Sequence, residues 1–157
     1  MLHLSIMELF FRAVPDSIIL IMGAHIFSRA NINNLKVLKS VIFMSFVIYL
    51  IRCLPITFGI HTLLGVVGVT IVSVKFHKID LIKALKAVFF TVFIQYLSEI
   101  INMAWIQICL GKNLELIFSN PTAKILYGIP SMLITSSTLY LCYLKYRSRK
   151  ELTNNEN

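Results

Sequence analysis

The feature that most constrains the fold is the alternation of long apolar runs with short clusters of lysine and arginine. Each run approaches the ~20 residues that an α-helix needs to cross a bilayer. Of the 157 residues, 57% are hydrophobic and 14% are charged, whereas a soluble domain carries about 25% charged residues. The sequence therefore predicts an all-α, polytopic transmembrane bundle of about five helices. The predicted spans are residues 4–28, 37–54, 56–74, 84–110 and 122–146, followed by a short tail at 147–157.

Two prolines complicate the first half of this prediction. Pro15 lies inside the first predicted span, where a missing backbone N–H kinks or breaks a helix. Residues 1–28 are therefore either one span or an interfacial helix followed by a short, tilted span. Pro55 disfavours helix at the residue before it, so we expect it to separate the second and third spans by a tight hairpin.

The basic residues predict the orientation of the bundle in a plasma membrane. Lysine and arginine accumulate in cytoplasmic loops, and eleven of the 15 fall on one side of the predicted spans. The amino terminus is then outside and the tail is cytoplasmic. The charge lies in short clusters with no basic stripe among exposed aromatics, so we expect a bilayer and no nucleic acid as partner. The eleven residues are Arg29, Lys36, Lys39, Lys75, Lys78, Lys83, Lys86, Lys145, Arg147, Arg149 and Lys150.

Glu99 is the strongest candidate for a functional residue. It lies near the middle of the fourth predicted span, and Gln95 and Asn102 share its helix face. An ionisable side chain at the membrane centre costs roughly 2.5–3.5 kcal/mol on insertion scales, so this stripe is expected to face the bundle interior. Two interpretations fit equally well: the stripe lines a ligand pocket or ion path, or it holds helices together by hydrogen bonds.

Three further charged residues, Arg12, Asp16 and Arg52, are predicted on the outer half of the bundle. Arg12 and Glu8 are spaced as an i, i+4 pair on a helix surface. Arg52 either extends to the outer headgroups or neutralises a carboxylate or an acidic ligand. We add all three to the predicted ligand-binding set. His25 is expected near the inner surface as an interfacial residue.

No catalytic, cofactor or metal motif accompanies these residues. The sequence contains no HExxH motif and no glycine-rich phosphate loop, and its three cysteines are widely spaced. We therefore expect neither an enzyme nor a bound cofactor or metal.

Five segments combine hydrophobic pattern with polar landmarks: MELFFRAVPDSIILIMGAHIFS, RCLPITFGIHTLL, KIDLIKALKA, SEIINM and NPTAKILYGIPS. Their order resembles the membrane sensor region of bacterial histidine kinases of the accessory-gene-regulator type, which carry a GHKL kinase domain. The resemblance extends over nearly the whole chain. It implies a bacterial plasma membrane, an extracellular ligand that is often a peptide, and a last helix that leads into a cytoplasmic dimerisation helix.

The family's phosphoacceptor histidine and ATP site have no counterpart in these 157 residues. The resemblance therefore implies a stand-alone sensor or regulatory protein that binds a peptide or small ligand and acts through a partner histidine kinase or as a homo-oligomer. Two alternatives stay open: a small transporter, or substrate-binding transporter subunit, that uses Glu99, and a structural or assembly protein.

Overall fold

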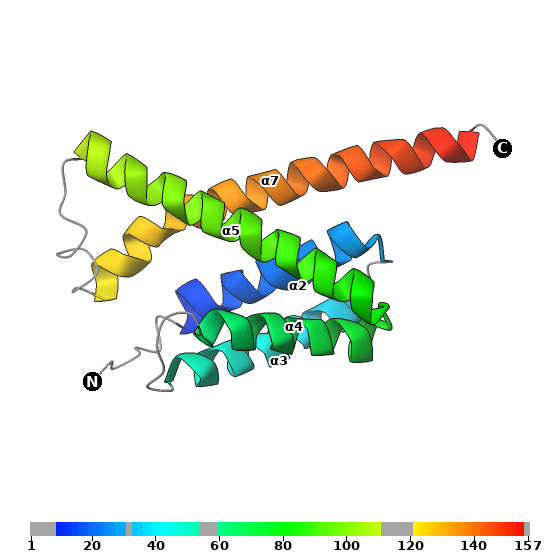
Figure 1. Cartoon of the computed structure of the whole chain (residues 1–157), viewed down its shortest axis with the longest axis horizontal. Coiled ribbons are helices and arrows are strands. Elements are labelled where there is room, and N and C mark those ends of the chain that lie inside the picture. The colour runs from blue at the N-terminus through cyan, green and yellow to red at the C-terminus, as the bar shows by residue number, and fades with distance from the viewer. Residues whose placement is uncertain (1–8, 31–32, 54–59, 111–120, 156–157) are drawn as a thin grey trace.

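The computed structural model describes residues 9–30, 33–53, 60–110 and 121–155, and these segments are almost entirely helical (Figure 1). The predicted all-α bundle of about five helices is confirmed. The helices are η1 (Leu9–Ala13), which is a π-helix continuous with α2 (Val14–Ser28), then α3 (Asn34–Cys53), α4 (Ile60–His77), α5 (Leu81–Leu110) and α7 (Pro121–Asn155).

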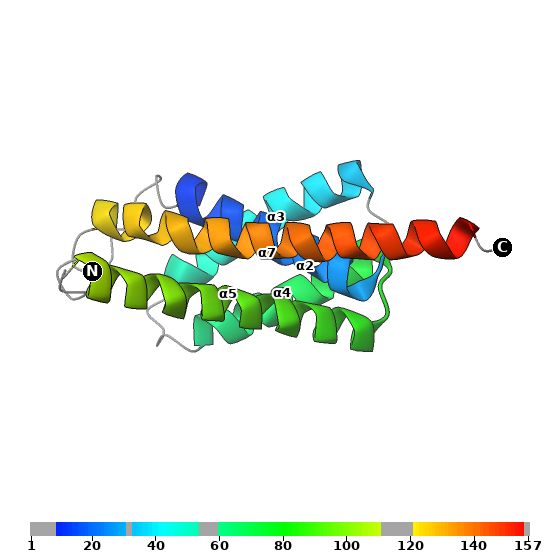
Figure 2. The same cartoon turned by 90° about the horizontal axis from the view of Figure 1, so that it is seen from above.

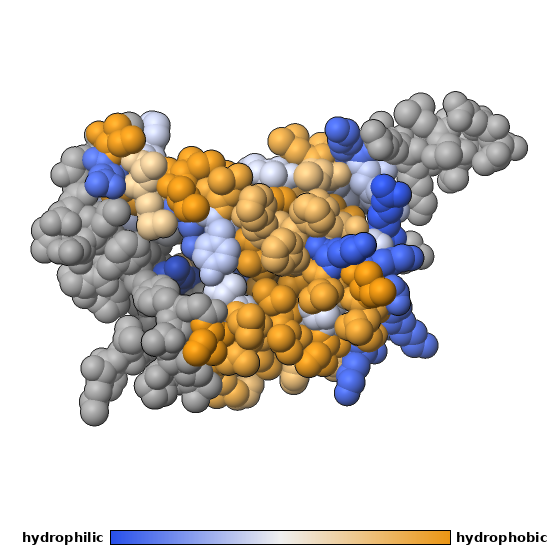
Figure 3. All heavy atoms as spheres, viewed as in Figure 1, coloured by the Kyte–Doolittle hydropathy of each residue, from blue (hydrophilic) through white to orange (hydrophobic). Residues whose placement is uncertain are grey.

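Four of these helices are long and apolar enough to cross a membrane, which makes the chain a multi-pass membrane protein. The crossings are Phe10–Ser28, Asn34–Ile51, Ile60–His77 and Leu81–Ile108. Large hydrophobic side chains are exposed along them, and Figure 3 shows an extensive hydrophobic face. Contact of such a face with lipid tails is favourable, whereas its exposure to water would be unfavourable. That α7 also crosses, over residues 122–146, stays a prediction.

Pro15 changes the type of helix instead of ending it. Residues 9–13 form a π-helix, and the α-helix begins at Val14. Pro15 has no N–H for an α-helical bond to Phe11, and its ring crowds that carbonyl. A wider π turn at this point accommodates both effects. The interfacial helix considered as an alternative falls largely at residues 1–8, outside the described residues, as does the hairpin at Pro55.

The tail is helical to a greater extent than hydropathy predicts. The last predicted span ends at residue 146, but α7 continues without interruption to Asn155. Residues 147–152 are rich in arginine, lysine, glutamate and leucine, which are good helix formers, and no glycine or proline stops the helix. At 1.5 Å per residue, its 35 residues extend for roughly 52 Å. The carboxyl end of α7 projects beyond the other helices (Figures 1 and 2).

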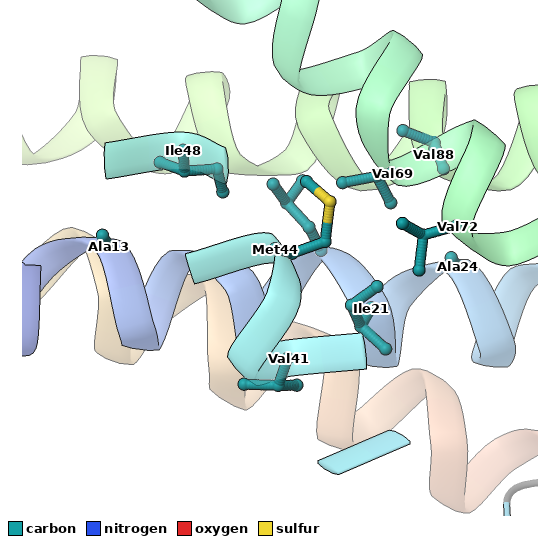
Figure 4. Packing of buried hydrophobic residues seen from close by; sticks show 10 residues of the cluster. Ala13, Ile21, Ala24, Val41, Met44, Ile48, Val69, Val72 and Val88 are labelled. Atoms are coloured by element: carbon teal, nitrogen blue, oxygen red, sulfur yellow. The ribbon is translucent and has the colours of Figure 1, made fainter. Parts of the chain in front are cut away.

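The apolar core is formed where α2, α3, α4 and α5 meet. Ile21 of α2, Met44 of α3, Val69 of α4 and Val88 of α5 are fully buried and belong to one cluster (Figure 4). The helices α2 and α5 approach closely at Gly23, where an added β-carbon would collide with the side chain of Thr91. Small residues at such crossings let membrane helices pack by van der Waals contact. This contact fixes how α5 lies across α2.

The two ends of the bundle differ in charge. At one end α2 and α4 finish and α3 and α5 begin, and this end carries Arg29 together with the lysines of α3, α4 and the start of α5. Hydrophilic residues gather there on the right of Figure 3. We call this the basic end. The opposite end holds the start of α2 and the later half of α5, which crosses α7.

Candidate functional site

A hydrogen bond between Asp16 and Gln95 joins α2 to α5 at the end opposite the basic end. The Gln95 side-chain Nε2 donates to Asp16 Oδ1 over 3.1 Å. Asp16 is only 5% exposed, and Gln95 is half-buried. A buried carboxylate is costly unless hydrogen bonds satisfy it. The amide of Gln95 is therefore a reason that an acid is tolerated inside this membrane bundle.

The close contact at Gly23 and Thr91 sets the register of this pair. Gly23 lies seven residues after Asp16, and Thr91 lies four residues before Gln95. The two helices run in opposite senses, since α2 ends and α5 begins at the basic end. Moving from the crossing toward the other end therefore leads to Asp16 on one helix and Gln95 on the other. Packing of small side chains thus positions the polar pair.

Asn102 connects the same face of α5 to α7. Its Nδ2 donates to the backbone carbonyl of Tyr127 over 2.6 Å, and Asn102 is 6% exposed. Pro130 lies inside α7 just beyond this carbonyl. A proline within a helix removes one backbone bond and opens the preceding turn. Pro130 deprives the Leu126 carbonyl of its helical donor, and the Tyr127 carbonyl that accepts from Asn102 is the next one along this turn.

Glu99 lies between these two contacts on α5. It is half-buried, one turn beyond Gln95 and just under one turn before Asn102. Arg12, in η1, is likewise half-buried and one turn before Asp16. Because the helices run in opposite senses, Arg12 and Glu99 are each displaced from the Asp16–Gln95 bond by about 6 Å along the helix axis toward the same end. We call the side chains of Asp16, Gln95, Glu99 and Asn102, with the Tyr127 carbonyl, the polar junction.

A further polar contact borders the polar junction on its α4 side. Thr62 Oγ1 and the Tyr96 hydroxyl are 2.6 Å apart, and Tyr96 directly follows Gln95. Figure 3 shows hydrophilic atoms in a hollow of the otherwise hydrophobic face, on the left of the view. Sequence reasoning missed Thr62 and Tyr96, because neither is charged and an uncharged side chain within an apolar span gives little sign of a contact with another helix.

The structure brings together part of the predicted ligand-binding set. Asp16, Gln95 and Asn102 take part in contacts between helices, with Glu99 and Arg12 one turn from the Asp16–Gln95 bond. Arg52 lies in the last turn of α3, but its side chain is outside the described part of the chain. Glu8, the predicted partner of Arg12, also lies outside the described residues.

His25 lies in the last turn of α2, at the basic end, and its interfacial position in the membrane stays a prediction. Its side chain is 1% exposed and buried where α2 meets the end of α4, a contact that the sequence did not predict. A lone histidine near a helix end gives no sequence signal of burial, because its burial depends on residues of other helices that are far away in the sequence.

The polar junction offers amide donors, carboxylate acceptors and a backbone carbonyl at the meeting point of three helices. Such a set suits recognition of a polar ligand, and among the described residues no three potential metal ligands gather. No family model matches the chain, and neither a curated protein nor a solved structure matches it.

Proposed function

We propose that this protein is a membrane sensor: a polar ligand, such as a peptide from outside the cell, binds at the polar junction, and α7 carries the change to the cytoplasmic side. The observation that carries the proposal is the hydrogen bond from Asn102 to the Tyr127 carbonyl. It joins the polar face of α5 to a helix that continues unbroken to Asn155.

The energetics of the polar junction suit a site that changes state. Within it the contacts between helices are individual hydrogen bonds, each worth about 0.6–2 kcal/mol in a membrane bundle. Apolar packing of Ile19 and Ile26 against Leu139 holds α7 to α2 elsewhere along the helix. A ligand that binds one arrangement of α5 and α7 better than another shifts the population of the two. Competition for the Asn102 amide or the Asp16 carboxylate therefore offers a way for a ligand to move α7 relative to α5.

The long α7 provides the route for the signal. It packs against both α5 and α2, and its carboxyl end projects past the basic end of the bundle (Figures 1 and 2). Under the predicted orientation this projection enters the cytoplasm. A rotation or translation of α7 would therefore be presented to a partner there, with a histidine kinase as the partner class that we propose.

Binding can be tested with the purified chain in lipid nanodiscs and a peptide extract of culture medium as the probe. Mass spectrometry would identify peptides that the nanodiscs retain. We expect Glu99→Gln and Asn102→Ala to lose retention that Gln107→Ala keeps, because Gln107 is exposed on the same helix. Equal retention by all three variants, or by empty nanodiscs, would count against a site at the polar junction.

A small transporter is the second candidate, and the burial of Asp16 favours it. A carboxylate that is 5% exposed within the crossing Phe10–Ser28 is a candidate carrier of a proton or cation. Co-purification in mild detergent separates the two candidates. Recovery of a kinase, with no flux in proteoliposomes, supports the sensor. Recovery of a transport ATPase, or flux abolished by Asp16→Asn or Glu99→Gln, supports the transporter.

A further inference from the structure

The basic end contains a second polar cluster that the polar junction does not involve. It consists of His25 from α2, Ser40 from α3, and Ser73 and His77 from α4. The His25 and His77 rings lie edge to face with centroids 4.2 Å apart. His77 Nε2 and Ser40 Oγ form a hydrogen bond of 2.8 Å. Three helices thus meet through two imidazole rings.

The hydrogen bonds of His25 determine where its proton lies. Nδ1 is 2.8 Å from the carbonyl oxygen of Ile21, which can only accept, so Nδ1 carries the hydrogen. In the neutral ring Nε2 is then a bare acceptor. This atom is buried without a hydrogen-bond partner, and so is the hydroxyl of Ser73. Ser73 lies one helical turn before His77 on the same face of α4.

A proton added to His25 Nε2 would therefore enter a completely buried site. A hydrogen on this atom would have no acceptor in place, so the packing around Nε2 must change for the atom to donate. The neighbouring ring of His77 can also take up a proton, and two charged rings at this separation repel each other.

The surroundings of the two histidines are mostly positive. Asp80 is the one carboxylate among the described side chains at this end, and it is exposed. The titratable or charged groups here are Arg29 after α2, Lys36 and Lys39 on α3, Lys75 and His77 on α4, Lys78 and Asp80 in the connection, Lys83 and Lys86 on α5, and Cys142, Tyr143, Lys145 and Tyr146 on α7.

We propose that His25 and His77 form a proton-binding latch, which holds the end of α4 against α2 and α3 while both rings are neutral and releases it when a proton binds. The latch lies directly before the turn into α5. His77 is the last residue of α4, Lys78 adopts a left-handed backbone conformation, and α5 begins at Leu81. Release would therefore also loosen the start of the helix that carries the polar junction.

The test measures the distance between α3 and α4 by electron-electron double resonance in nanodiscs. Alanine replaces Cys53, Cys109 and Cys142, and spin labels are placed at Leu38→Cys and Ile71→Cys, two exposed positions. We expect the distance distribution to broaden or lengthen on titration from roughly pH 8 to roughly pH 3, a range wide enough to protonate both rings. Labels at the other end of the same helices, Leu50→Cys and Leu63→Cys, should change less.

Substitutions by asparagine then show whether the two rings cause the change. His25→Asn with His77→Asn should abolish the pH response, whereas His61→Asn, at the opposite end of α4, should preserve it. If the double variant does not fold, His77→Gln alone is the second variant, because His77 is only half-buried. A response that persists in the folded variant, or no response in the wild type over this range, would overturn the latch.

Nitrogen NMR of the wild-type imidazoles requires no substitution. It should show that protonation of His25 or His77 coincides with the change in distance. Protonation of both rings with an unchanged distance between α3 and α4 would show that the ring contact does not control the release of α4, and would also overturn the proposal.

Discussion

The apolar core and the polar junction hold their helices together in different ways. In the core, Ile21, Met44, Val69 and Val88 interlock with almost no exposed surface, and Gly23 contacts Thr91 directly. At the polar junction the helices are joined by single hydrogen bonds between half-buried or buried polar groups. Close packing tolerates little displacement, whereas a hydrogen bond can be exchanged for one to a ligand.

This difference divides the molecule into a frame and a responsive part. The frame is the crossing of α2 with α5, supported by α3 and α4 (Figure 4). The responsive part is the later half of α5 with α7, which lies across it (Figure 1). Substitutions in the frame should therefore affect stability most, and substitutions in the responsive part should affect ligand response more than stability.

The largest effect on stability is expected for Gly23→Ala. The new β-carbon would collide with Thr91, and overpacking of this kind costs about 1–3 kcal/mol. Gly65→Ala is the matched control, because nothing lies within 4 Å of its β-carbon position. Unfolding in detergent, followed by circular dichroism, measures both. Thr91→Ala should recover part of the loss, since it removes two of the three colliding atoms. Equal stability of the two alanine variants would refute the close crossing.

Gln95→Leu should come next. It deprives the buried Asp16 carboxylate of a donor, which we expect to lower the free energy of unfolding by about 1–3 kcal/mol. Gln107→Leu makes the same chemical change at an exposed position of α5. If both variants unfold alike, the bond between α2 and α5 contributes nothing measurable.

A smaller loss of stability is expected for Asn102→Ala, about 0.6–2 kcal/mol, because one hydrogen bond between membrane helices is lost. Ser98→Ala is the comparison, since the Ser98 hydroxyl bonds only its own helix at Ile94. Distances between spin labels at Trp105→Cys on α5 and Leu133→Cys on α7, in a cysteine-free background, should broaden in Asn102→Ala and stay narrow in Ser98→Ala. Unchanged distances in both variants would show that the Asn102 hydrogen bond does not determine the position of α7.

The smallest effect is expected for Tyr96→Phe. It removes the bond to Thr62 at a position where Tyr96 is 45% exposed, and we expect about 0.5 kcal/mol. Thermal unfolding should barely change, while retention of peptides that bind the polar junction should fall if the hydroxyl borders the ligand. A loss of stability as large as that of Gly23→Ala would place Tyr96 in the frame instead.

Sequence patterns located most of the helices but not their full lengths. α3 begins at Asn34 and α5 at Leu81, each three residues before the predicted start, because helices continue past the lysines at which hydropathy ends a span. The extension of α7 from residue 146 to Asn155 has the same cause. The helix propensity of residues 147–152 would have predicted this extension of α7, whereas their hydropathy does not.

The candidate site was predicted as one stripe on one helix. Spacing alone placed Gln95, Glu99 and Asn102 on a common face of α5, because the period of an α-helix is fixed. Spacing could not show that Gln95 meets Asp16, 79 residues away, or that Asn102 reaches a backbone carbonyl of α7. Nor could it show that His25 is buried against the end of α4.

The sequence by itself determined that this chain forms apolar helices in a membrane, because a backbone in lipid must satisfy its hydrogen bonds internally. Only the tertiary structure decided which helices meet and through which residues. Lipid is as apolar as the helix surfaces, so burial of apolar side chains does not select partners in a bilayer. Shape at Gly23 and Thr91, and hydrogen bonds at Asp16, Gln95 and Asn102, make that selection, and both require residues far apart in sequence to fit each other.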